Sequence, residues 1–189
     1  ILSLKNSYRA ALDTLPDLLF EMDLEGRYLS CHSPRRELLT APPEELVGRN
    51  VRDVLPAEAA NTCLAALRDA QSDGISTGRQ ITLDVPGGNL RFELSVARKA
   101  DVAGESPRFV VLSRDVTERW RAGQALRESE SLLRAMVDNT PIEIWARDLE
   151  GRCIMENAAV VAHWGSLLGK RPEDGDVSAE DLALWKANN

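Results

Sequence analysis

Positive charge, histidine, cysteine and long apolar runs are all scarce in this chain of 189 residues. Its 23 Lys and Arg are outnumbered by 30 Asp and Glu, and the net charge of -7 argues against nucleic acid as a direct partner, because that binding depends on neutralising phosphates. No apolar run approaches the roughly 20 residues that cross a bilayer. The first residues also lack the basic flank and cleavage site of a secretion signal. We therefore expect a cytoplasmic chain without membrane contact in this segment, and we interpret it as part of a longer protein.

The motifs of metal sites and of common enzymes are also absent. The three cysteines are isolated, and no CxxC or Cys/His cluster suggests zinc. The sequence contains no GxSxG, no glycine-rich phosphate loop and no HExxH. Cys31 and His32 are adjacent, but neighbours on a strand point to opposite faces and do not form a catalytic pair. The sequence predicts no metal site and no intrinsic catalysis, so any enzymatic activity would belong to an output domain outside this chain.

One phrase does occur twice. PDLLFEMDLEGRYLS starts at Pro16 and PIEIWARDLEGRCIM starts at Pro141, an offset of 125 positions. Further on, LVGRN from Leu46 recurs as LLGKR from Leu167, now at an offset of 121. A deletion of four residues explains the change in offset. Ordered matches at a domain-sized spacing predict two tandem modules, the second cut short by the chain end.

The elements of the first copy follow from its apolar pattern. We expect an amphipathic helix ending before Pro16, then strands LLFEMD and RYLSCH joined by a turn at Glu25-Gly26. Short helical pieces come next, with Pro43 suited to a first helical position and Gly48 to a stop.

A longer helix is predicted over PAEAANTCLAALRDAQSDG, where Gly74 is the end signal. Three strands follow it: ITLDV, LRFELSV and FVVLSRDV, of which the last is the most uniformly apolar and is expected to be central. The fold class is therefore α+β, with a five-stranded antiparallel sheet, helices on one face and a long helix after the last strand.

These residues resemble a PAS domain. DLEGRYL is similar to the family's D-x-x-G-x-I, PPEELVGRNVRDVLP to its E-E-L-I-G-x-x-x-x-D-L-x-P, and RDVTERW to its closing D-I-T-E-R before a signalling helix. The resemblance covers Tyr8 to about Thr117, and partially 133–189. It implies a PAS domain at 1–117, a coiled-coil linker at 118–139 and a partial second PAS domain at 140–189.

The resemblance implies a function in signal transduction. Such a module passes a change induced by a ligand or partner through its helix to an output domain of the same polypeptide, commonly a histidine kinase or a cyclic-dinucleotide synthase of the GGDEF type. The alternative is a ligand-free dimerisation module.

The linker helix is expected to transmit the signal and to form a homodimer. Asp115 can cap it, with Glu118 three residues on reaching back. A heptad seam of Ala122, Leu126, Ser129, Leu133 and Met136 favours a parallel coiled coil, although the stripe could pack on its own domain instead. The residues assigned to signal transmission are Asp115, Thr117, Glu118, Leu126 and Leu133.

The known PAS cofactors can be tested against the residues. Val51 stands where the flavin-photosensing branch has its reactive Cys, which excludes a covalent flavin adduct. No His lies within 49–74, which disfavours haem. Non-covalent flavin, a small apolar ligand with one polar end, and a filled core stay open, with no cofactor favoured. The candidate pocket residues are Phe20, Met22, Cys31, His32, Arg36, Asn50, Val51, Leu64, Leu67, Phe92, Leu94 and Phe109.

The second copy is expected to be unstable alone, because a hairpin by itself is marginal in water. Residues after about Asn139 should be mobile or borrow packing from a neighbouring chain.

Overall fold

The computed structural model describes residues 17–100, 106–171 and 174. The helix expected before Pro16 lies outside these residues. The chain divides into two compact units, 1–122 and 123–189, so the boundary falls inside the linker helix rather than at either of its ends. Within the described residues, no helix is long and apolar enough to cross a membrane.

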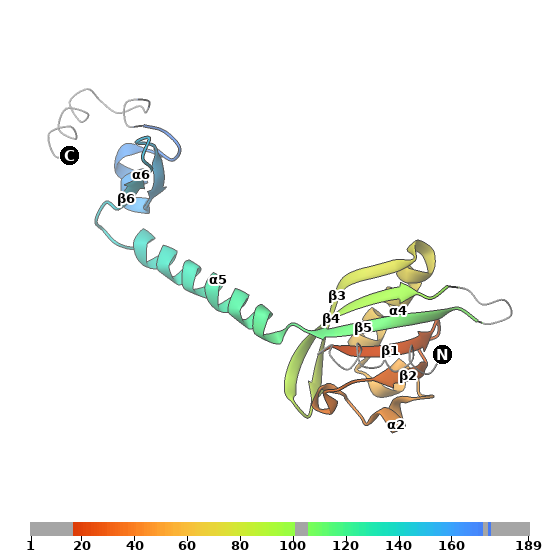
Figure 1. The fold of residues 1–189 in the computed structure, drawn as a ribbon. Coiled ribbons are helices and arrows are strands. Elements are labelled where there is room, and N and C mark those ends of the chain that lie inside the picture. The colour runs from red at the N-terminus through yellow and green to blue at the C-terminus, as the bar shows by residue number, and fades with distance from the viewer. Residues whose placement is uncertain (1–16, 101–105, 172–173, 175–189) are drawn as a thin grey trace. The chain divides into compact units, whose positions relative to one another are not determined.

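The first unit contains one antiparallel sheet in the order β2-β1-β5-β4-β3 (Figure 1). This confirms the predicted five-stranded α+β fold, and the uniformly apolar last strand is indeed the central one. The strands are β1 Leu18–Asp23, β2 Tyr28–His32, β3 Ile75–Val85, β4 Gly88–Arg98 and β5 Arg108–Asp115.

Helices connect the two halves of this sheet. The short pieces are η1 Arg36–Leu38, α2 Pro43–Leu46 and α3 Val51–Val54, and the longer α4 spans Ala57–Asp73. Helix α4 packs on β3 and β4 through a buried face that includes Cys63, Leu64 and Leu67. It ends at Gly74, whose φ of 84° is the left-handed conformation that glycine adopts without strain.

Strand β3 is longer than the sequence pattern predicts. It begins at Ile75, six residues before Ile81, and pairs with the end of β4 around a bulge next to Gly78. Residues 75–80 are exposed apart from Ser76, so they show no apolar alternation. Backbone hydrogen bonds hold this segment in the sheet, and a pattern of buried side chains cannot reveal them.

The long helix α5 spans Thr117–Asp138 and continues from β5 with one intervening residue. The second unit then contains strands β6 Trp145–Arg147 and β7 Cys153–Glu156, followed by helix α6 Ala158–Trp164. Cys153, Asn157 and Val160 are buried there, so the second hairpin has a small core of its own.

The repeated phrase forms the same turn twice. The amide of Gly26 donates to the Asp23 carbonyl at 3.2 Å, and the amide of Gly151 donates to the Asp148 carbonyl at 3.1 Å. In both copies the next amide donates to the aspartate side chain, at 2.7 and 2.8 Å. The glycine φ angles are 84° and 81°, which explains why glycine occupies this position in each copy.

The second repeated phrase packs against the first in both copies. Gly48 donates its amide to the Tyr28 carbonyl at 2.8 Å, and Gly169 donates its amide to the Cys153 carbonyl at 2.7 Å. The paired strands also share their register and the position of their bulge. The offsets of 125 and 121 are therefore structural equivalences, and the four missing residues fall between the hairpin and the LLGKR segment.

Candidate functional site

A cavity of about 40 Å³ lies in the core of the first unit. Its walls come from β1 and β2, the short helical segment, α4 and the inner faces of β3, β4 and β5. Most lining side chains are aliphatic or aromatic. The polar groups that reach it are Tyr28, Thr40, Cys63 and Ser113.

Two hydroxyl groups on the cavity wall lack a hydrogen-bond partner in the part of the chain that the structure describes. Tyr28 is 5% exposed and Ser113 is 4% exposed, yet neither side-chain oxygen makes a hydrogen bond to another described residue. Buried polar groups are normally paired. These hydroxyls can therefore hydrogen-bond a molecule inside the cavity.

Burial also determines the protonation states around the cavity. Desolvation raises the pKa of Tyr28 well above its usual value and raises the pKa of the Cys63 thiol to about 12. Both groups are neutral at physiological pH, so the Tyr28 hydroxyl keeps its proton and can donate it in a hydrogen bond. The cavity offers neutral polar groups and no charge.

Three of the predicted pocket residues, Phe20, Met22 and Leu94, line this cavity. A further group is buried in the surrounding core without reaching the cavity wall, and Cys31 packs partly buried against that core. The buried group is Val51, Leu64, Leu67, Phe92 and Phe109.

The predicted polar residues do not line the cavity. Arg36 is exposed on η1, and His32 is half-buried at the end of β2. Asn50 caps α3 and donates its side-chain amide to the Glu25 carbonyl at 2.8 Å, so its role is in the turn. These residues follow strand ends or precede helices, where polar side chains serve turns and caps.

Tyr28 and Ser113 were missed by the sequence analysis. Tyr28 lies opposite Met22 in the β1–β2 register, across a bulge after Glu21 that alternation along the strand does not show. Ser113 sits on β5 between apolar residues, where a serine has no pattern that marks it as a site residue. The pairing register of the hairpin was the signal that could have located Tyr28.

The start of α5 is tied to the strands that line the cavity. The Asp115 carboxylate accepts hydrogen bonds from the amide and hydroxyl of Thr117, at 2.9 and 2.6 Å. The same hydroxyl accepts from the Arg91 amide on β4 at 2.8 Å, and the Arg91 guanidinium lies 4.8 Å from the centre of the Trp120 ring. A shift of β4 or β5 therefore acts directly on the first turn of the helix.

Glu118 does not complete the predicted capping box. Among the described residues it makes no hydrogen bond back to the start of the helix. The Thr117 hydroxyl takes that place, because it reaches both Asp115 and β4.

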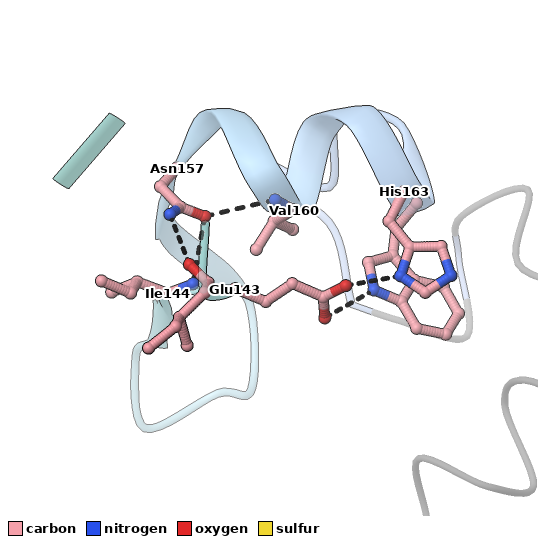
Figure 2. Close-up of polar contacts among 7 residues, drawn as sticks. Glu143, Ile144, Asn157, Val160 and His163 are labelled. Carbon is pink, nitrogen blue, oxygen red and sulfur yellow. Dashed lines mark hydrogen bonds and ion pairs between the residues drawn. The ribbon is translucent and has the colours of Figure 1, made fainter. Parts of the chain in front are cut away.

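In the second unit, Asn157 joins three elements (Figure 2). It is fully buried, and its side-chain amide donates to the carbonyls of Val137 on α5 and Ile142, at 3.0 and 2.8 Å. Its side-chain oxygen accepts from the amides of Ile144 and Val160, at 3.0 and 3.2 Å. One side chain thus holds the end of α5, the approach to β6 and the first turn of α6.

Figure 2 also shows Glu143 reaching toward the end of α6. Its carboxylate accepts from the Trp164 indole at 2.9 Å and pairs with His163 Nδ1 at 2.5 Å. The hydrogen bond from Trp164, followed by that from His163, lowers the pKa of Glu143. The equivalent residue in the first copy is Leu18, a cavity-lining residue, so the two copies differ in polarity at this position.

No group of three or more His, Cys, Asp and Glu among the described residues is placed to hold a metal ion.

A family model described as the PAS fold matches residues 12–121, which is more than half of the chain. The virulence sensor protein BvgS of Bordetella pertussis is 35% identical over 73 residues, which cover 36% of this chain and 6% of that protein. The uncharacterized protein y4lL of Sinorhizobium fredii is 26% identical over 154 residues, covering 78% of this chain and 18% of that protein. The chain spans less than a fifth of either relative.

Solved structures share the fold at low identity. A PAS domain from Colwellia psychrerythraea superposes with a TM-score of 0.50 at 17% identity, covering 61% of this chain and 98% of that one. An RNA-binding Light-Oxygen-Voltage receptor superposes with a TM-score of 0.54 at 20% identity, covering 68% of this chain and 37% of that one. At such identities the similarity concerns the fold alone.

Proposed function

The chain belongs to the PAS family, and from this premise we propose that its first unit is the cytoplasmic sensor module of a signalling protein. The observation that carries the proposal is the cavity with two unpaired hydroxyls, Tyr28 and Ser113. The strands that line it also hold the start of α5 through Arg91, Asp115 and Thr117. Occupation of the cavity would reach the helix through β4 and β5.

The cavity chemistry favours a small, uncharged ligand with an apolar body and one hydrogen-bond acceptor. A cavity needs roughly 10–15 Å³ to hold one water, so about 40 Å³ suits a molecule of a few heavy atoms. The apolar wall would surround its body, and the Tyr28 hydroxyl would donate to its acceptor. This volume favours neither haem nor flavin.

Thermal unfolding with a panel of small alcohols, ketones and hydrocarbons tests the ligand class. We expect ketones and alcohols to raise the melting temperature of the whole chain, and Tyr28→Phe to remove most of that rise while leaving the response to hydrocarbons. The purified protein should show neither a Soret band nor a flavin spectrum. A stoichiometric cofactor band would contradict this ligand class.

The ligand-free dimerisation module is the second candidate, and the small size of the cavity favours it. If no panel member shifts the melting temperature and native mass spectrometry finds no retained molecule, this second function is supported and the sensor function is not.

Transmission to an output domain is also a proposal. Leu126, Leu133 and Met136 are 59–61% exposed on α5 and follow the predicted heptad seam. This exposure supports a parallel homodimer through α5, which would carry the change toward an output domain such as a histidine kinase or a GGDEF-type synthase. The relationship to a virulence sensor protein, over 36% of the chain, supports the same role.

A further inference from the structure

A groove of about 930 Å³ runs along the second unit between α5 and the second hairpin. Its apolar wall is formed by Leu133, Val137, Ile154, Met155, Val161 and Leu168, which we call the hairpin groove. Four of these side chains are well exposed: Leu133 at 59%, Ile154 at 58%, Leu168 at 57% and Val161 at 42%. So much exposed apolar surface in one concave site is typical of a binding surface.

The apolar stripe of α5 is wider than a two-stranded coiled coil can cover. With Leu126 and Leu133 at heptad position a, Leu132 falls at position g and Val137 at position e. These flanking positions usually carry charged residues that pair between helices. Leu132 is 59% exposed within its own chain, so its burial needs a surface outside the a/d seam.

The heptad register states where that surface is. In a parallel coiled coil, a g residue lies opposite the e residue that comes five positions later on the partner helix. Leu132 of one chain would therefore face Val137 of the other, and Val137 is part of the hairpin groove. Ala125 and Ala135 flank Leu132 on the helix and leave room for close approach.

We propose that the hairpin groove is the docking site for α5 of a second copy of this chain, with Leu132 as the side chain that enters it. The inference rests on the proposed parallel homodimer and adds a second contact to it. The seam alone would join only the helices. The groove contact joins each second hairpin to the opposite helix, and a twofold dimer makes this contact twice.

Cysteine pairs across the interface test the proposal in the full chain. One chain carries Leu132→Cys, a second carries Met155→Cys, and the mixture is treated with a short bismaleimide. We expect a cross-linked heterodimer. Ser131→Cys is the matched control, because position f faces away from the seam, and it should give little product with Met155→Cys. The parent chain, with its three native cysteines, provides the background.

The Leu126→Cys variant separates failure of the groove from failure of the dimer. This residue should form a disulfide with its own copy across a parallel seam. If Leu126→Cys cross-links and the 132–155 pair gives no more product than the 131–155 pair, the groove proposal is overturned and the coiled coil remains. If Leu126→Cys does not cross-link, the parallel dimer and the groove contact are both overturned.

Affinity provides a second measurement. Leu132→Glu should raise the dimer dissociation constant about tenfold or more, as expected when one buried leucine is lost from an interface. Ser131→Glu should leave it unchanged. Because Leu132 is exposed in the single chain, circular dichroism of both variants should match the parent. Equal dissociation constants for the two variants would contradict the proposal.

Discussion

Gly26 shows why one residue of the repeated phrase cannot vary. Its φ is 84°, and a Cβ atom placed on it would lie 2.7 Å from both Leu64 Cδ2 and Val51 Cγ2. The position therefore combines a left-handed backbone with close contact between the hairpin turn and α3 and α4. The amide of Val51 also donates to the Gly26 carbonyl at 2.9 Å, which holds the turn against the helices.

Gly26→Ala should lower the free energy of unfolding by about 2–4 kcal/mol, combining left-handed strain with overpacking. Gly48→Ala is the matched control, because Gly48 has a φ of 89° and nothing within 4 Å of its Cβ position. It should cost only about 1 kcal/mol, the strain alone. Urea unfolding of both variants measures the difference, and equal losses would mean that the contact with Val51 and Leu64 is unimportant.

Asn157 makes a prediction about the second unit at the same scale. Asn157→Ala leaves two buried amides and two carbonyls without their partner, and should cost about 2–4 kcal/mol of local stability. Hydrogen exchange should then become faster together at the end of α5 and in the first turn of α6. If only one of these segments responds, Asn157 does not join them. Asn139→Ala, which loses one exposed contact to Ala135, is the control.

The prediction of the site was least successful at the scale of single residues. Apolar positions such as Phe20, Met22 and Leu94 follow from strand alternation, because burial leaves a period of two in the sequence. Tyr28 and Ser113 could not be found in this way. Whether a polar side chain faces a cavity depends on the pairing register, on bulges and on the residues across the sheet.

At the scale of elements, the hairpins, α4 and the order of strands were predicted because each carries a strong local signal. A repeated Asp-x-x-Gly turn, a period of 3.6 and terminal glycines mark their bounds. The first six residues of β3 and the role of Thr117 were not predicted. Both depend on hydrogen bonds to β4, which lies far along the sequence.

Helix α5 gives the prediction that belongs to this scale. Replacing Leu126 and Leu133 by Lys places charges in the proposed seam and should convert the dimer to monomers in sedimentation equilibrium. Both side chains are exposed in the single chain, so the monomer should remain folded. A double variant that still sediments as a dimer would place the interface elsewhere. Gln124→Lys with Ser131→Lys, at two f positions, is the control.

At the scale of the whole molecule, the two units should differ in stability. Strand β4 is paired on both sides, by β3 and β5, whereas β6 and β7 form a two-stranded sheet. Amides of residues 142–155 should therefore exchange with solvent far faster than those of residues 90–96 when the protein is dilute. Equal protection of the two segments would show that the second hairpin is as stable as the sheet of the first unit.

The uninterrupted course of α5, from the Asp115–Thr117 cap to the carbonyl held by Asn157, makes the helix an angular ruler. Each residue inserted within it turns everything that follows by about 100° about the helix axis, whereas seven residues restore the direction to within about 20°. Single-residue insertions and deletions in α5 should therefore be the most disruptive length changes in the chain, and changes by multiples of seven the best tolerated.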